Sequence, residues 1–427
     1  MYSNSGTKNR PNHNITSGLS RHCQVCGSED LELVLDLRNQ PLCDSLLTNA
    51  QLDEPEVFYP LRQLWCKNCT LSQLDYIVQG EVVYHQNYPY RTGVTRELVA
   101  YQQQMATDLI KDLDIPSDSL ISDIGSNDGT LLSSFKAADM RVIGIEPTNI
   151  AHIANEDGIE TLHTPFNQTI AKQIVESKGQ AKLVTATNVF AHMASLGDVL
   201  EGLEILVADN GFFVLENHYL IPVMERLQFD TIYHEHLRTY SLRSLITLFN
   251  YYNFTVVDVK EVSRYGGNIR VYVAKGKNHT PKTSVNELLA KEERIGLSDP
   301  DYYKQFRNKS IALKNQLVEF IVKCNQKNIS IAGNSCPGRC STLLNFAGIG
   351  PDMLPYLGEQ ATSLKLGKYL PGTHIPIVNN QRLIDEQPEY VILLAWHYAD
   401  PIIEQLRARG LRSKFIVPMP EFKIIDK

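Results

Sequence analysis

The chain has 427 residues, of which 43% are hydrophobic, and a formal net charge of −7 at pH 7. This length exceeds what one hydrophobic core supports and predicts roughly two or three domains. The negative charge gives no electrostatic support for binding nucleic acid or an anionic membrane, and no apolar run approaches the roughly 20 residues that span a bilayer. Because the N-terminus also lacks the apolar segment of a secretory signal, we expect a cytoplasmic protein with a small or modular substrate.

Residues 1–20 are rich in Asn, Ser, Thr and Gly and have almost nothing to bury, which predicts a disordered tail. Residues 21–85 then carry two Cys-x-x-Cys pairs, which are Cys23 with Cys26 and Cys66 with Cys69. Each pair can present two thiolates to a tetrahedral ion from a tight turn, as in a zinc ribbon, and four thiolates would make the Zn²⁺ structural. The long gap between the pairs keeps a second interpretation open, in which the thiols are reduced and bind no metal or are redox-active.

Residues 86–276 alternate between predicted helices and strands, beginning with a helix over about 94–113. Leu120 to Ile124 is predicted to be a buried strand, and the glycine-bearing turn after it should open a helix whose N-terminal amides face a cofactor. The next predicted strand, 141–145, ends in Glu146, whose carboxylate can accept both hydroxyls of a ribose. This arrangement fits either a nicotinamide site or an S-adenosyl-L-methionine (SAM) site. The residues expected to form it are Asp123, Gly125, Asn127, Gly129, Glu146 and Asn188.

The remaining elements of this region favour SAM. Further strands are predicted at 182–187, 211–216, 254–259 and 269–274, with helices near 196–207 and after Ser241. The last two strands resemble a β-hairpin, and a closing antiparallel hairpin after the fifth strand is typical of SAM methyltransferases. Asn127 also stands where dinucleotide-binding folds usually keep Gly. Residues 277–427 begin with a charged helical linker over about 284–328, and a second α/β pattern opens at 329–333.

A short connector concentrates groups that can move protons, because Tyr233, His234, Glu235 and His236 follow one another. It lies between the fifth strand and the next helix, which places it at the carboxyl edge of the sheet, where ligands of open α/β sheets bind. His192 and His218 follow the fourth and fifth strands and reach the same edge. Histidine suits removal of a weakly acidic proton near neutral pH. The alternative is that these histidines are satisfied core or surface residues.

Four motifs occur in this order: the Cys-x-x-Cys pairs, Ile-Gly-Ser-Asn-Asp-Gly-Thr-Leu-Leu, Phe-Asp-Thr-Ile-Tyr-His-Glu-His and Tyr-Leu-Pro-Gly-Thr-His-Ile-Pro. From about His22 to the C-terminus, the chain resembles nucleotide-sugar C-methyltransferases, which methylate a carbon of a dTDP-linked or related 4-keto-deoxysugar. The resemblance implies an α/β protein with a small zinc-binding N-terminal domain and a central class I SAM methyltransferase domain of Rossmann-like fold. It also implies a C-terminal Rossmann-like domain that helps to hold the nucleotide sugar.

The family pattern implies that His236 is the general base and that Tyr233, Glu235 and His192 complete the catalytic site. A carbon beside a ketone becomes acidic only if its enolate is stabilised, so His192 or Tyr233 is expected to donate to the ketone oxygen. The resulting carbon, expected to be C3, would then attack the SAM methyl group. The residues expected to contact substrate are Tyr88, Tyr90, His218, Arg339, Lys368 and His374.

Several alternatives stay open. The two tyrosines also fit core packing, and the Lys368 to His374 segment also fits an ordinary Pro-Gly turn. Members of the family often have Ala-Lys-Gly where this chain has Pro337-Gly338-Arg339, which leaves the nucleotide and sugar undecided, although Arg can bind phosphate. An NAD-dependent nucleotide-sugar oxidoreductase and a non-catalytic nucleotide-sugar-binding protein are the other functional hypotheses. The expected partner is a nucleotide-linked sugar, and a monomer is one expectation for the oligomeric state.

Overall fold

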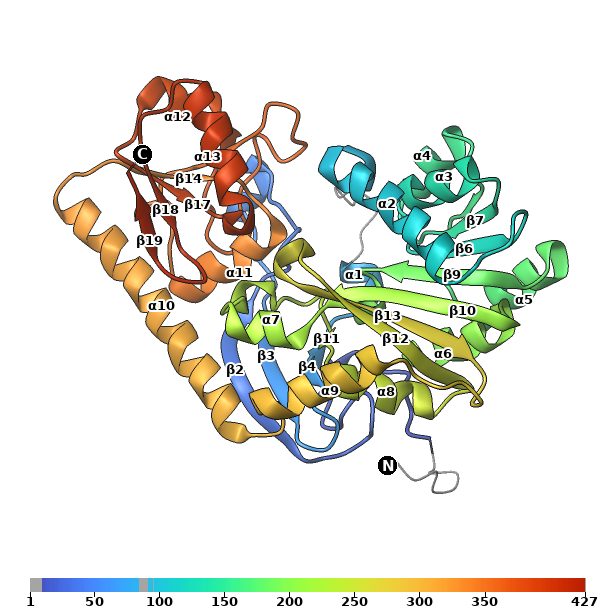
Figure 1. Cartoon of the computed structure of the whole chain (residues 1–427). Helices are drawn as coiled ribbons and strands as arrows, with labels where there is room; N and C mark the ends of the chain where they lie inside the picture. The colour runs from blue at the N-terminus through green and yellow to red at the C-terminus, as the bar shows by residue number, and fades with distance from the viewer. Residues whose placement is uncertain (1–9, 84–90, 95, 427) are drawn as a thin grey trace.

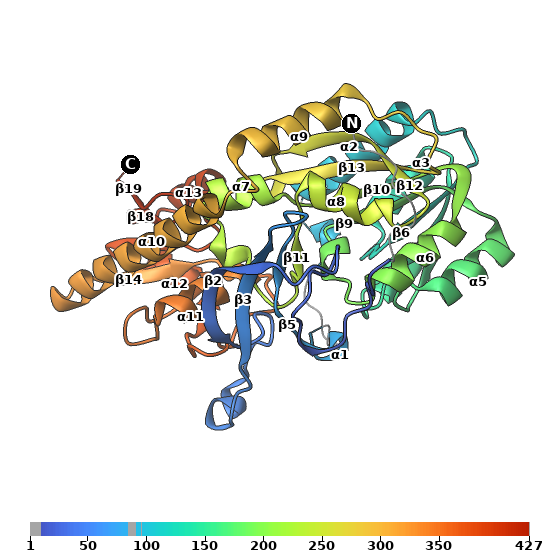
Figure 2. The same ribbon diagram turned by 90° about the horizontal axis from the view of Figure 1, so that it is seen from below.

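The computed structural model describes residues 10–83, 91–94 and 96–426. Within these ranges, a four-stranded, a seven-stranded and a six-stranded sheet form the N-terminal, central and C-terminal parts. Figure 1 shows the long helix α10 (Pro300–Gln326) running along the outside from the central part to the C-terminal part. Figure 2 shows strands β2 (Leu31–Gln40) and β3 (Tyr59–Cys66) between those two parts. No helix in the described ranges is long and apolar enough to cross a membrane.

The N-terminal sheet contains a strand from the middle of the chain. Its order is β11-β4-β3-β2, in which β11 (Arg238–Thr239) pairs antiparallel with β4 (Ser72–Leu74). Two short strands, β1 (Gly18–Leu19) and β5 (Tyr76–Ile77), pair beside it. The other elements here are η1 (Asn49–Asp53) and α1 (Gly80–Val83). Because β11 begins two residues after His236, the N-terminal sheet anchors the histidine-bearing connector.

The prediction of a disordered tail through residue 20 is wrong for the described residues 10–20. His13 is buried, and its ring nitrogens lie 2.7 Å from the Tyr252 hydroxyl and 2.8 Å from the Val25 carbonyl oxygen. The Ile15 amide donates to the Ala194 carbonyl at 3.1 Å. Composition suggested nothing to bury here, but one buried imidazole and a few backbone contacts join this segment to both neighbouring parts.

The central sheet has the strand order β12-β13-β10-β9-β6-β7-β8. Its strands are β6 (Leu120–Ile124), β7 (Arg141–Ile145), β8 (Thr161–Leu162), β9 (Ala181–Thr187), β10 (Val207–His218), β12 (Phe254–Val262) and β13 (Asn268–Lys275). The predicted bounds of β6 and β7 are confirmed at both ends. The predicted hairpin is also confirmed, since β12 pairs antiparallel with β13, and β13 pairs antiparallel with β10. Strands β6 to β10 are parallel, so their carboxyl ends share one edge.

Helices cover both faces of this sheet (Figure 1). They are α2 (Arg96–Asp112), α3 (Thr130–Ala137), α4 (Ala151–Glu156), α5 (Gln168–Lys178), α6 (Leu196–Leu206), α7 (Leu220–Glu225), α8 (Leu242–Asn250) and α9 (Thr283–Ile295), with short turns η2 (Thr92–Val94), η3 (Phe190–His192), η4 (Phe229–Thr231) and η5 (Arg264–Gly266). The predicted cap of α8 is confirmed, because the Ser241 side chain accepts a hydrogen bond from the Ser244 amide at 3.0 Å.

The C-terminal part is a mostly parallel sheet, as a Rossmann-like domain requires, and only β19 runs antiparallel among its described strands. Its elements are β14 (Ile331–Asn334), β15 (Leu357–Glu359), β16 (Ile377–Asn379), β17 (Tyr390–Leu393), β18 (Lys414–Val417), β19 (Lys423–Ile425), α11 (Gly338–Ala347), α12 (Gln381–Glu386), α13 (Ala399–Ala408) and η6 (Trp396–Tyr398). The linker before it is two helices, because Gly296 ends α9 at a φ of 90° and Pro300 opens α10.

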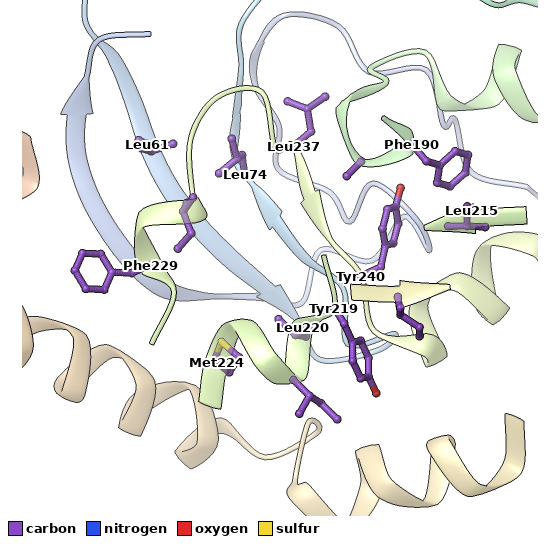
Figure 3. Close-up of a cluster of buried hydrophobic side chains, with 14 of the residues drawn as sticks. Leu61, Leu74, Phe190, Leu215, Tyr219, Leu220, Met224, Phe229, Leu237 and Tyr240 are labelled. Carbon is purple, nitrogen blue, oxygen red and sulfur yellow. The ribbon is translucent and has the colours of Figure 1, made fainter. Parts of the chain in front are cut away.

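The hydrophobic core continues from the N-terminal sheet into the central sheet. Figure 3 shows Leu61 and Leu74 of the N-terminal strands beside Leu237 and Phe229, which flank the histidine-bearing connector. All four side chains are buried. The connector is therefore packed between two domains, and this packing limits the directions that its polar side chains can take.

Candidate active site

A cavity of about 930 Å³ lies where the three parts meet. It receives the carboxyl ends of the central strands, the histidine-bearing connector 233–236, and residues such as Asp44 and Arg339 from the flanking parts. Ligand pockets are commonly roughly 300–1,000 Å³, so this cavity lies at the upper end of that range. A cofactor and a second ligand can share it.

The turn between β6 and α3 forms one wall of the cavity. Gly125 adopts a φ of 71°, and a Cβ there would lie 2.5 Å from Cγ1 of Val189. Asn127 follows at a φ of 51°, and its amide donates to Oε2 of Glu146 at 3.0 Å. Gly125, Asn127 and Glu146 line the cavity, whereas Gly129 lies behind the turn, where a Cβ would lie 3.0 Å from Cγ2 of Ile159.

Both carboxylates of this wall are held by neighbours. Oε1 of Glu146 accepts from the Thr148 amide at 2.8 Å, and each oxygen keeps a further lone pair that can accept a ribose hydroxyl. Asp123 accepts from the Thr185 hydroxyl at 2.6 Å. Burial raises the pKa of the Asp123 carboxyl to about 7, which the Thr185 contact opposes and the Glu146 charge assists. Asn188 also lines the cavity, and its Oδ1 accepts a hydrogen bond from the side-chain amide of Asn268 at 3.1 Å.

Another part of the cavity wall consists of residues that no motif marked. They are Leu98 and Gln102 of α2, Thr148, Pro165 and Phe166, and Met193, Ala194, Ser195 and Val199 around the start of α6. Apolar residues at helical spacing predicted the helices, but that spacing does not distinguish a helix face on the core from one on a ligand.

Three histidine rings converge beside this wall. The ring centroid of His236 lies 4.9 Å from that of His192 and 5.0 Å from that of His218. The Tyr233 ring lies 4.0 Å from it. All four side chains line the cavity, so the structure brings together groups that the sequence placed after two different strands, the fourth and the fifth.

A backbone contact sets the tautomer of His236. Its Nδ1 lies 2.7 Å from the Thr231 carbonyl oxygen. Because a carbonyl oxygen only accepts, Nδ1 carries the proton and Nε2 is left as the acceptor. Burial lowers the pKa of His236 to about 4, with the Arg339 charge acting in the same direction and the Thr231 contact opposing it. Burial also holds the pKa values of His192 and His218 well below their ordinary range, so the cluster is neutral near pH 7.

The other members of the connector face different surroundings. His234 is turned towards the N-terminal part, with Nε2 3.3 Å from the Pro60 carbonyl oxygen. The Cys43 thiol donates to Oε1 of Glu235 at 3.7 Å. Burial, followed by the Glu235 charge, raises the pKa of Tyr233 well above its ordinary value. The Tyr233 phenol therefore keeps its proton and can donate it in a hydrogen bond.

The C-terminal part contributes residues that differ from those expected. Arg339 lines the cavity, but among the described lining residues neither Lys368 nor His374 is present, and His374 instead pairs with Glu56. Lys365 lines the cavity in their place, donates to the Cys336 carbonyl at 2.7 Å, and lies 3.6 Å from Asp44. Two lysines lie three residues apart in this turn, and the sequence offered no signal to choose between them. Tyr88 and Tyr90 lie outside the described residues.

The four paired cysteines form one cluster whose Sγ atoms lie within 4.8 Å of one another. Cys23 and Cys69 are separated by 3.5 Å, as are Cys26 and Cys66. Zinc bound to four thiolates at about 2.3 Å would place the sulfurs about 3.8 Å apart, so the geometry fits a tetrahedral zinc ion.

Each cysteine pair belongs to the same kind of turn. The residue after each pair, Gly27 or Thr70, has a φ of 71° or 62° and donates its amide to the carbonyl of the first cysteine at 2.9 Å. A matching turn therefore presents two thiolates from each side, which favours a shared metal ion over the alternative of reduced thiols that bind no metal or are redox-active.

Three family models match successive parts of the chain. A model described as "Putative zinc binding domain" matches residues 23–84, "Methyltransferase domain" matches 98–259, and "C-methyltransferase C-terminal domain" matches 263–420. Similar solved structures include the PH0226 protein of Pyrococcus horikoshii OT3, at 13% identity and a TM-score of 0.36 over 45% of this chain and 98% of that one. Another is the 1,6-didemethyltoxoflavin-N1-methyltransferase of Burkholderia thailandensis, at 15% identity and a TM-score of 0.35 over 50% and 96%.

A relative matches almost the whole length. C-methyltransferase NovU of Streptomyces niveus is 32% identical over 409 residues, which are 95% of this chain and 96% of NovU. Together with the methyltransferase domain model, this match decides between the two cofactors in favour of SAM. The chain belongs to the family of zinc-containing, SAM-dependent C-methyltransferases.

Proposed function

We propose that the protein transfers a methyl group from SAM to C3, beside the ketone of a nucleotide-linked 4-keto-deoxysugar, in deoxysugar biosynthesis. The observation that carries this proposal is the placement of His236, whose Nε2 is an acceptor in the cavity that also receives the cofactor turn. A neutral imidazole can remove a proton from a carbon that a ketone has acidified. The C-methyltransferase name of NovU supports carbon as the methylated atom.

In the proposed reaction, Nε2 of His236 takes the proton from the carbon beside the ketone. The Tyr233 phenol, which keeps its proton, donates a hydrogen bond to the ketone oxygen as negative charge develops there. His192 is the alternative donor, since its ring also contacts that of His236. Bound SAM supplies the electrophilic methyl group that the carbon receives. The cavity walls would hold SAM and the sugar close together, so that the transfer becomes an effectively unimolecular step.

The nucleotide end of the substrate is proposed to lie towards the C-terminal part. Arg339 and Lys365 supply positive charge to this side of the cavity, beside the start of α11 at Gly338. Burial acts to lower the pKa of Lys365, but the Asp44 carboxylate and other nearby groups raise it above its ordinary value. A charged ammonium and a guanidinium suit a diphosphate. His218 is proposed to contact the sugar, because it lines the cavity beside His236.

The test is incubation with methyl-labelled SAM and a panel of 4-keto-deoxysugar nucleotides, followed by mass spectrometry and NMR of the product. We expect the label on a sugar carbon for one member of the panel and no label with the 4-hydroxy analogue, which cannot form an enolate. Label on oxygen or nitrogen, or equal labelling of the 4-hydroxy analogue, would contradict the proposal.

A further inference from the structure

Helix α11 of the C-terminal part contacts the segment just before the histidine-bearing connector, on both sides of Thr231. Nη2 of Arg339 lies 3.1 Å from Oδ1 of Asp230, in an ion pair whose members are both buried. One turn further along α11, the Thr342 hydroxyl donates to the Ile232 carbonyl at 3.3 Å. The two residues that flank Thr231 are therefore both held by the same helix.

A second C-terminal residue holds Asp230 from another direction. The indole Nε1 of Trp396 donates to Oδ2 of Asp230 at 2.8 Å. The Arg339 guanidinium lies over the Trp396 ring, 5.2 Å from its centroid. Asp230 is 1% exposed, so its carboxylate has little contact with water and depends on these partners.

Thr231 connects this contact to the proposed base. Its carbonyl accepts the proton of His236 Nδ1 at 2.7 Å, and that contact leaves Nε2 as the acceptor. The direction of a carbonyl depends on the backbone torsions of its own residue and the next. Those torsions are restricted where the residues on either side are anchored.

We infer that the C-terminal domain positions the base, through Arg339, Thr342 and Trp396, as well as lining the cavity. These are positioning residues, since Asp230 and the Thr231 carbonyl transmit their effect to His236. The inference rests on the proposed role of His236 as base. It assigns a catalytic consequence to the contacts that Arg339, Thr342 and Trp396 make with residues 230 and 232.

Arg339 alone cannot test the inference, because it also lines the cavity. Asp230, Thr342 and Trp396 are buried and are absent from the described residues that line the cavity. Thr342→Val and Trp396→Phe each remove one donor and keep most of the side-chain volume. Thr342→Ser is the conservative control, since it keeps the hydroxyl.

The kinetic experiment compares these variants in the full-length, zinc-loaded protein, using the labelled transfer assay. We expect Trp396→Phe, and the double variant that combines Trp396→Phe with Thr342→Val, to lower kcat by about tenfold or more. The reason is that a small displacement of the base from the carbon that it deprotonates lowers the rate strongly. KM for SAM and for the sugar should change by less than about twofold, and Thr342→Ser should retain kcat. Zinc content and the unfolding temperature identify any variant that is merely unfolded.

A spectroscopic experiment reads the tautomer without turnover. Histidine is labelled with nitrogen-15, and the signal missing from His236→Gln assigns the ring of His236. We expect the wild-type ring to carry its proton on Nδ1, and the double variant to show a mixture of tautomers.

The outcomes separate the inference from the proposed function. An active His236→Gln enzyme would remove the base and with it the proposed mechanism. An inactive His236→Gln enzyme together with unchanged kcat and tautomer in the double variant would overturn the inference alone. A higher KM for the sugar at unchanged kcat would also overturn it, because the C-terminal domain would then act through substrate binding.

Discussion

The zinc cluster and the histidine cluster each gather several polar side chains, but they are assembled differently. Each cysteine pair belongs to one tight turn whose amide hydrogen bond closes onto its own first cysteine. The histidine cluster instead draws His192, His218 and His236 from three separate segments, and contacts with other domains hold the connector that carries His236. Two halves of a zinc site can therefore form locally, whereas the active site exists only after the domains have packed.

The largest effect is expected at the zinc cluster. Cys66→Ser should lower zinc well below about one ion per chain and lower the unfolding temperature by roughly 10 °C or more, because the metal-binding free energy is part of the folding free energy. Cys324→Ser is the matched control, since Cys324 is a buried thiol on α10 outside the cluster. Metal analysis and thermal unfolding provide the readout. Full zinc content in Cys66→Ser would disprove the ligand assignment.

The next effect separates chemistry from folding. His236→Gln should lower kcat by roughly 10²–10⁴-fold, the range typical of general-base catalysis, while SAM affinity and zinc content stay unchanged. His279→Gln serves as the control, because His279 is exposed and bonds the Lys275 carbonyl outside the cavity. Transfer kinetics and calorimetric titration of SAM make the measurement. If zinc content or stability fell as far in His236→Gln as in Cys66→Ser, the roles of the histidine cluster in chemistry and of the zinc cluster in folding would not be separate.

A glycine pair tests the cofactor turn. Gly125→Ala should raise the Kd for SAM by roughly tenfold, because the new Cβ would meet Cγ1 of Val189 at 2.5 Å and the φ of 71° is strained for Ala, at a cost on the order of 1–3 kcal/mol. Gly179→Ala is the matched control. Gly179 has a similar φ of 88°, but no described atom lies within 4 Å of the position that a Cβ would take there. This variant should therefore lower stability without changing the Kd. Equal effects on SAM binding in the two variants would argue against the turn as the cofactor site.

The smallest effect concerns pH. Because the pKa of His236 is lowered to about 4 from its ordinary 6.5, kcat should stay nearly level between pH 8 and 6 and fall only as pH approaches 4. Between pH 6.5 and 4 this ring binds more protons in the unfolded chain than in the folded chain, so its contribution to stability should decline as pH falls through this window. A pH profile of kcat and of unfolding tests both statements. An inflection near pH 6.5 in the nitrogen-15 signal of the His236 ring would show that the ring is solvated as an ordinary histidine.

The local elements follow from the sequence alone. Strands β6 and β7 follow from short apolar runs, whereas the Ser241 cap and the two cysteine turns depend on contacts between residues close in the chain. Pattern and spacing therefore suffice to predict all of them. The left-handed turn at Gly125 belongs to the same class. The cysteine pairs and the Gly125 turn were also two of the four motifs that carried the resemblance to C-methyltransferases, and with it the cofactor and the order of domains.

Only the tertiary structure decided which side chains meet at the cavity. Lys365 faces it in place of Lys368 and His374, His234 turns towards Pro60, and β11 joins a sheet formed more than a hundred residues earlier. Each of these directions depends on packing partners distant in sequence. His234 and His236 lie two residues apart and both line the cavity. Only the three-dimensional packing around each ring places one against the Pro60 carbonyl of the N-terminal part and the other against the Thr231 carbonyl.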